Sequence, residues 1–197
     1  MTSQIPPMLH IPPVSAWVAR FAPLVPRTAP VLDLACGSGR HLRHFRDRGH
    51  AVAGVDIDLQ GVADLAGAEG VEVLRADIEG GPWPFAGRCF AGIVVANYLH
   101  RPLLPVIVEA LAPGGVLIYE TFGQGQQRFG RPATPAHLLQ AGELLQAVAG
   151  RLQVIAYEHG EVASPRAAVV QRLCAVADLA PVADLNGSPE PHPLPAP

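Results

Sequence analysis

Three aspartates, Asp33, Asp56 and Asp77, each follow a short apolar run, and the first run leads directly into Gly37 and Gly39. Glycines let the backbone turn tightly and approach a ligand, and free amides at a helix start favour an anionic group. Ligands of open α/β sheets bind outside the carboxyl ends of the strands, so we expect the carboxylates to line one crevice. A single such aspartate would be read as an ordinary cap or strand-end residue. Three in this order favour a cofactor site for a ligand with an amino group, a ribose diol and an adenine amine.

The elements that must position these residues alternate between strands and helices. We expect strands at 31–36, 51–56, 71–77, 90–97 and 115–122, and helices at 15–25, 38–49, 59–67, 102–111 and 135–150. Two last strands, 151–162 and 167–179, have no helix between them and must therefore pair antiparallel. The pattern predicts a doubly wound α/β fold with a mostly parallel seven-stranded sheet and a C-terminal antiparallel strand pair.

The 197 residues correspond to one domain. We expect an extended arm over 1–13, the domain over 14–180, and a proline-rich disordered tail over 181–197. No apolar run reaches the roughly 18 residues that a membrane span needs. The chain is therefore expected to be soluble and cytoplasmic, with no membrane partner.

The composition excludes several classes of protein. All 14 basic residues other than histidine are arginine, so lysine-dependent Schiff-base, pyridoxal-phosphate and P-loop chemistry is excluded. Cys36, Cys89 and Cys174 lack the spacing of a zinc or iron–sulfur site, and His41 with His44 are too few for zinc, so no metal is predicted. The formal net charge of -3 gives no broad attraction to nucleic acid.

The segments VLDLACGSGRH, GVDID, RADI and LAPGGVLIYETF resemble the successive motifs of class I S-adenosylmethionine-dependent methyltransferases. The whole segment from about Ser15 to Leu179 resembles a compact bacterial subgroup of this family, near the tellurite-resistance methyltransferases. A nicotinamide-binding site is disfavoured, because Leu42 stands where the dinucleotide fingerprint has a third small residue. Ala35 departs from the family pattern, which often has a glycine there.

The resemblance implies S-adenosyl-L-methionine as cofactor and assigns parts of it to residues. Asp33 and the loop from Cys36 to Gly39 would hold the methionine end, and Asp56 would accept hydrogen bonds from the ribose hydroxyls. The segment after the third strand would border the adenine, and the end of the fourth would close the site. The implied cofactor-binding residues are Asp33, Ala35, Cys36, Gly37, Gly39, Asp56, Ile57, Asp77, Ile78, Ala96 and Asn97.

Candidate residues for the acceptor side come from the ends of the fourth and fifth predicted strands. His100, Tyr98 and Glu120 are catalytic candidates, and His100 is the best general base because imidazole titrates near neutral pH. His100 could equally cap the helix near Pro102, and the tyrosines could pack in the core. Tyr119, Phe122, Arg128 and Arg131 are candidate substrate contacts, the arginines from a loop at 123–135 that is either a lid or a solvated loop.

The sequence favours methyl transfer to a small-molecule acceptor by direct displacement, a reaction for which positioning can suffice. Modification of RNA or protein is the second hypothesis, with Arg128, Arg131 and the arginines of the 38–49 helix as contacts. A cofactor-binding partner protein with little catalysis of its own is the third, and a nicotinamide-binding protein is a distant fourth. The acceptor atom and the oligomeric state stay open.

Overall fold

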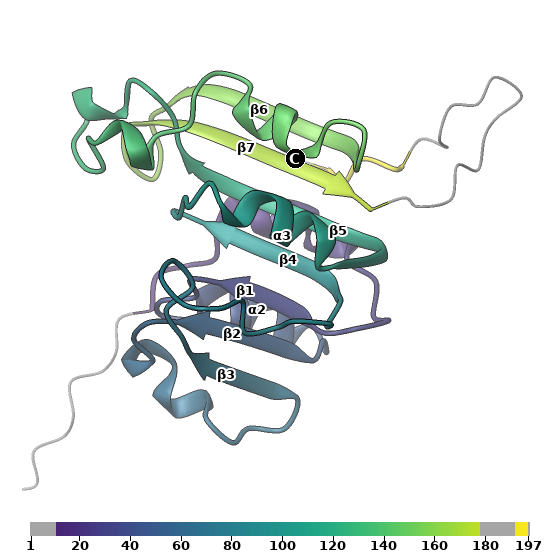
Figure 1. Ribbon diagram of the computed structural model, residues 1–197. Coiled ribbons are helices and arrows are strands. Elements are labelled where there is room, and N and C mark those ends of the chain that lie inside the picture. The colour runs from purple at the N-terminus through teal and green to yellow at the C-terminus, as the bar shows by residue number, and fades with distance from the viewer. Residues whose placement is uncertain (1–10, 178–191, 197) are drawn as a thin grey trace, which may run out of the picture.

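A seven-stranded sheet organises the protein, whose computed structural model describes residues 11–177 and 192–196. The strand order is β3-β2-β1-β4-β5-β7-β6 (Figure 1). The strands from β3 to β5 run parallel, and β7 pairs antiparallel with both β5 and β6. The strands are β1 (Val31–Leu34), β2 (Val52–Asp56), β3 (Val71–Arg75), β4 (Phe90–Ala96), β5 (Leu111–Phe122), β6 (Gln153–Val162) and β7 (Ala168–Val176). This confirms the predicted fold class and the antiparallel C-terminal pair.

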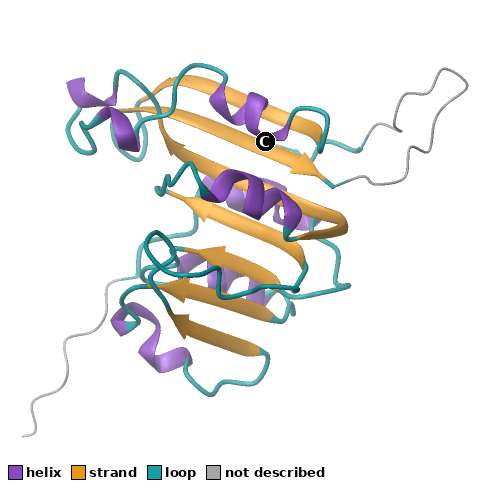
Figure 2. Ribbon diagram, in the orientation of Figure 1, coloured by secondary structure: helices purple, strands orange, loops and turns teal. Residues whose placement is uncertain are grey.

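Helices cover both faces of the sheet, as Figure 2 shows. One face packs against α1 (Ala16–Phe21) and α2 (Arg40–Asp47), and the other packs against α3 (Leu103–Glu109) and α4 (Glu143–Val148). All four residues of β1 are buried, whereas the edge strand β3 is partly exposed along its length. Burial on both faces explains why the central strands read as continuous apolar runs rather than alternating ones.

Two predicted helices were wrong in form. The segment expected as a helix at 59–67 is a 3-10 helix over Gln60–Leu65. The helix expected at 135–150 is broken into a 3-10 turn, Pro135–His137, and α4. Between them Leu139 bridges to Gly123, with its N–H donating to the Phe122 carbonyl, so this stretch extends the sheet instead of coiling.

The first helix begins where the sequence predicts. The Ser15 hydroxyl accepts hydrogen bonds from the N–H groups of Trp17 and Val18, which satisfies two amides of the first turn. Helix α1 ends at Phe21 and continues as a 3-10 turn to Leu24. Most of the predicted 1–13 arm and of the predicted 181–197 tail lies outside the described residues.

Candidate active site

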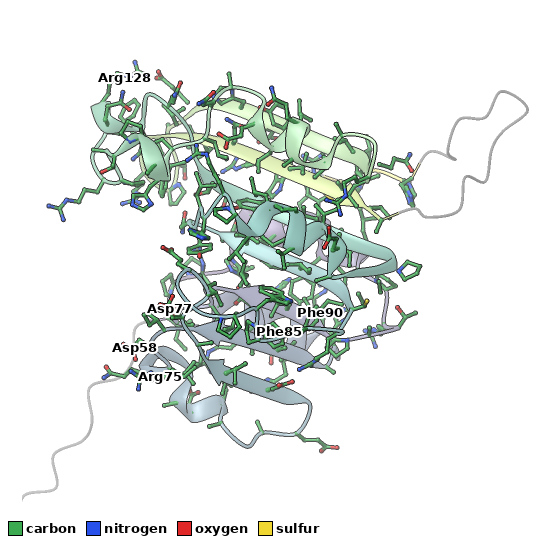
Figure 3. The ribbon with its side chains drawn as sticks, viewed as in Figure 1. Asp58, Arg75, Asp77, Phe85, Phe90 and Arg128 are labelled. Atoms are coloured by element: carbon green, nitrogen blue, oxygen red, sulfur yellow. The ribbon has the colours of Figure 1, made fainter. Side chains whose placement is uncertain are left out.

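An acidic cavity of about 500 Å³ opens at the carboxyl ends of β1, β2 and β3. We call it the acidic cavity because its charged lining residues are Asp56, Asp77 and Glu79. Its other lining residues are Ala35, Ile57, Ala76, Ile78 and Tyr98. Asp77 lies at the edge where the parallel strands end (Figure 3). The order of the strands thus brings together carboxylates that are 21 positions apart in the chain.

The glycine loop after β1 is held by Asp56. One carboxylate oxygen of Asp56, Oδ2, accepts a hydrogen bond of 2.8 Å from the Gly37 amide, and Oδ1 accepts one of 3.1 Å from the Asp58 amide. Gly37 and Gly39 have φ values of 53° and 69°. Ala35 also has a left-handed φ, 53°, which explains physically why a glycine is common at this position.

Asp77 is exposed and stays ionised to low pH. Its Oδ1 accepts hydrogen bonds from the amides of Gly80 and Glu79, at 3.0 and 2.9 Å. These two donors, with the Gly80 amide first, lower the pKa of the Asp77 carboxyl. No other hydrogen bond engages Oδ2 within the described part of the chain, so this oxygen can face a ligand.

Tyr98 lines the acidic cavity, and His100, which does not line it, contacts the lining residue Glu79. Burial, then the charge of Glu79, raises the pKa of the Tyr98 hydroxyl, so this group remains protonated at neutral pH. His100 Nδ1 is 3.7 Å from Glu79 Oε2, and its carbonyl accepts a hydrogen bond from Leu103. Tyr98 can therefore donate a hydrogen bond into the cavity, and His100 is oriented by Glu79 beside it.

Asp33 and Cys36 lie beneath the glycine loop, and neither lines the acidic cavity. Asp33 is 3% exposed, and its Oδ2 accepts a hydrogen bond of 3.1 Å from the Leu42 amide in the first turn of α2. Burial, followed by the charges of Asp33 and Asp56, raises the pKa of the Cys36 thiol to about 12. Cys36 is therefore a neutral packing residue, and Asp33 anchors the helix that follows the loop.

A second cavity, of about 450 Å³, lies at the same edge over β5 and β7. We call it the arginine cavity because Arg40, Arg166 and Arg172 line it. Its remaining lining residues are Pro13, Val14, Ser15, Ala16, Asn97, Glu120, Phe122, Val162, Ser164, Pro165, Ala168 and Val170. Successive residues at the end of β4 line the two cavities: Asn97 lines the arginine cavity, and the next residue, Tyr98, lines the acidic cavity.

Glu120 belongs to a polar network on the wall of the arginine cavity. Its Oε2 accepts a hydrogen bond of 2.5 Å from Arg172 Nε, and its Oε1 accepts one of 2.7 Å from the Ser15 hydroxyl. Arg172 also contacts Glu158 at 3.1 Å. The Nε2 atom of the buried His41 ring accepts a hydrogen bond of 3.4 Å from the Ser15 amide. The Nδ1 atom of the same ring lies 3.8 Å from Asp33 Oδ1. Sequence reasoning missed this network, whose members come from widely separated segments.

Three of the four predicted substrate residues line neither cavity. Tyr119 is 1% exposed and donates its hydroxyl hydrogen bond to the Tyr98 carbonyl, so it is a core residue. Arg128 forms an ion pair with Glu161 and lies at the far end of the molecule from Asp77 (Figure 3). Arg131 is exposed, and its carbonyl accepts a hydrogen bond from Gln126. Of the four predicted contacts, only Phe122 lines the arginine cavity.

The remaining predicted cofactor contacts lie at the end of β4 and in the lining of the acidic cavity. Ala96 is the last residue of β4, and the Asn97 amide donates a hydrogen bond of 2.8 Å to the Glu120 carbonyl. Asn97 has a left-handed φ of 58° and is exposed. Ile57 is 63% exposed at the rim of the acidic cavity, and Ile78 is buried in its wall.

Two further properties concern metals and membranes. Over residues 11–177 and 192–196, no group of three histidine, cysteine, aspartate or glutamate side chains is placed to hold a metal ion. Within the same ranges, none of the helices has the length and apolar character required to cross a bilayer.

Comparison with known proteins agrees with this arrangement. Residues 31–115 match a family described as a methyltransferase domain. A malonyl-[acyl-carrier protein] O-methyltransferase of Serratia marcescens is 30% identical over 132 residues, which cover 64% of this chain and 47% of the relative. The chain thus spans about half the length of the curated relatives it matches.

Solved structures share the fold. The TehB protein of Haemophilus influenzae superposes with a TM-score of 0.63 at 18% identity, covering 81% of this chain and 60% of TehB. A 1,6-didemethyltoxoflavin-N1-methyltransferase from Burkholderia thailandensis, solved with S-adenosylhomocysteine, superposes with a TM-score of 0.59 at 21% identity, covering 82% and 76%. Residues 31–115 are therefore similar to a methyltransferase domain, and the chain shares the fold of these solved structures.

Proposed function

We propose that the protein transfers the methyl group of S-adenosylmethionine to a small-molecule acceptor. One observation carries the proposal: at the end of β4, two successive residues line cavities of opposite charge, Asn97 the arginine cavity and Tyr98 the acidic cavity. The acidic cavity would hold the cofactor and the arginine cavity the acceptor. Asn97 would then stand between the methyl group and the acceptor.

The residues of the acidic cavity fit the cofactor. Its volume of about 500 Å³ is within the range of small-molecule sites. The carboxylates of Asp56 and Asp77 can accept hydrogen bonds from ribose hydroxyls and an adenine amine, while Ile57 and Ile78 offer apolar contact to the rings. A Cβ on Gly37 would meet no atom within 4 Å, so the glycine loop faces open space where the methionine end would lie.

When bound, the cofactor supplies a methyl group on a positively charged sulfur, which an acceptor atom takes by direct displacement. The protein then needs to align the two molecules and exclude water. Two of the three candidate bases are unsuited to removing a proton. Glu120 is hydrogen-bonded to Arg172 and Ser15, and the Tyr98 hydroxyl keeps its own proton. His100 is the remaining candidate base, 3.7 Å from Glu79, and would serve an acceptor that must lose a proton.

A small acceptor is favoured over RNA by the arginines of α2. Arg43 is paired with Asp64 at 2.7 Å, and Arg46 with Asp47 at 3.1 Å, so these charges are largely neutralised on the helix surface. Arg40 lines the arginine cavity. The relatives named above are an O-methyltransferase and an N-methyltransferase, so the acceptor class has to be inferred from the cavity itself.

The test is methyl transfer from radiolabelled S-adenosylmethionine to three separate acceptor pools: a filtered small-molecule cell extract, total RNA, and denatured cell protein. We expect label in the small-molecule pool, with S-adenosylhomocysteine formed in equal amount. Label in RNA or protein instead would overturn the acceptor assignment. Cofactor binding with no transfer to any pool would favour a partner protein with little catalysis of its own.

A further inference from the structure

We propose that the arginine cavity binds an acceptor that carries an oxyanion, such as a carboxylate, beside an apolar body. This inference rests on the proposed function and names its substrate class. Three arginines line the cavity, whereas Glu120 is its one carboxylate among the described residues. The excess of positive charge is local, because the whole chain has a net charge of -3.

The three arginines of the cavity differ in whether a carboxylate of the protein already pairs with them. Arg172 is neutralised within the protein, because it contacts both Glu120 and Glu158. Arg40 donates a hydrogen bond of 3.2 Å to the Pro13 carbonyl and forms no ion pair with any described residue. Arg166 likewise has no carboxylate partner in the described ranges. Two guanidinium groups of the cavity therefore have charge and donors available for a ligand.

The position of Arg166 suits a ligand that is partly apolar. Its guanidinium carbon lies 5.5 Å from the centre of the Phe122 ring, so cation and aromatic face form one surface. Val162, Ala168 and Val170 continue this surface as apolar lining. A planar guanidinium binds a carboxylate or phosphate through two parallel hydrogen bonds, while the adjoining apolar wall would contact the rest of the molecule.

The neighbouring acidic cavity makes the assignment selective. Asp56, Asp77 and Glu79 would repel an anionic acceptor from the cofactor's place, and the arginines would repel the cationic sulfonium from the acceptor's place. The two charges therefore sort donor and acceptor into their own cavities. If the oxyanion itself accepts the methyl group, it carries no proton that a base must remove. Glu120, which is already hydrogen-bonded to Arg172 and Ser15, is then not needed as a base.

Fluorine NMR with matched ligands tests the charge preference. Trifluoromethylbenzoate, its amide and trifluoromethylbenzylamine share one apolar body and differ in charge, and trifluoromethylphenyl phosphate tests a second oxyanion. Each is titrated into the full chain with and without S-adenosylhomocysteine. We expect an oxyanion to bind about tenfold more tightly than the amide. The more tightly bound of the two oxyanions identifies the anionic group.

The Arg166→Gln variant should weaken the preference for the oxyanion, because only Arg40 then remains available, and Arg166→Lys should restore part of it. Arg151→Gln is the matched control, because Arg151 pairs with Glu109 away from both cavities. Binding of both oxyanions no tighter than that of the amide, or an unchanged preference in Arg166→Gln, would overturn the inference. Failure of S-adenosylhomocysteine to bind would instead overturn the proposed function, whatever the benzoate result, so the two failures are distinguishable.

Discussion

Asp56 shows how one side chain can both build a site and belong to it. Its two oxygens accept hydrogen bonds from the amides of Gly37 and Asp58, and these bonds fix the glycine loop and the turn after β2. The same carboxylate lines the acidic cavity. Each carboxylate oxygen can accept more than one hydrogen bond, so holding the loop leaves capacity for a ligand.

Gly39 and Gly37 are expected to tolerate alanine differently. Both have positive φ, which costs an alanine about 1 to 2 kcal/mol. A Cβ on Gly39 would also lie 2.4 Å from Val62 Cγ1, and such overpacking costs about 1 to 3 kcal/mol more. We therefore expect Gly39→Ala to lower the free energy of unfolding in urea more than Gly37→Ala does. Equal losses in the two variants would contradict the packing described for this loop.

Residues whose role depends on their place along a strand could be predicted from the sequence. Asp56 and Asp77 were predicted to line one crevice, because each comes after an apolar run and the carboxyl ends of parallel strands share one edge of the sheet. The partners of Glu120 could not be predicted, because Arg172 lies 52 positions away on an antiparallel strand whose register no local pattern fixes. The same holds for Arg166, which the β6–β7 connection brings to the ring of Phe122.

Among the elements, the segment from Pro13 to Ala16 joins the fold to the acceptor side. It lines the arginine cavity and leads directly into α1. Ser15 connects the two roles, because its hydroxyl caps α1 and donates a hydrogen bond to Glu120. The cavity wall therefore depends on the start of this helix.

Ser15→Ala should lower the free energy of unfolding by about 1 to 3 kcal/mol, because it removes the helix cap and a hydrogen bond to a carboxylate. Thr134→Ala is the matched control, since Thr134 precedes a 3-10 turn without a side-chain cap hydrogen bond. Chemical denaturation of both variants measures the difference. A Ser15→Ala protein as stable as Thr134→Ala would show that the cap contributes nothing.

The order of the elements was predictable, and their exact form was not. Apolar runs of four to seven residues between turn residues identify β1, β2 and β4, because buried parallel strands read in this way. The break before α4 was missed, since Leu138 and Leu139 fit a helical pattern equally well. Their backbone is instead set by the sheet-like pairing of Leu139 with Gly123, a contact made only in the folded chain.

Across the whole molecule, charge is separated along one edge of the sheet. The acidic cavity lies over β1 to β3, the arginine cavity lies over β5 and β7, and β4 ends between them. The fold accounts for most of this division, because the parallel half supplies aspartates after its strands, while the antiparallel pair and its connection supply Arg172 and Arg166; Arg40 comes from α2. The site as proposed is a property of the strand order and cannot be assigned to any one motif.

The central claim is that the acidic cavity binds S-adenosylmethionine through Asp56, and calorimetric titration tests it most directly. S-adenosylmethionine, S-adenosylhomocysteine and NAD are titrated into the wild type, Asp56→Asn, and the control Asp47→Asn, whose aspartate lies exposed at the end of α2. We predict that the wild type and the control bind both adenosyl ligands and not NAD, and that Asp56→Asn binds them about tenfold more weakly. No binding by the wild type, a preference for NAD, or unchanged affinity in Asp56→Asn would contradict the account.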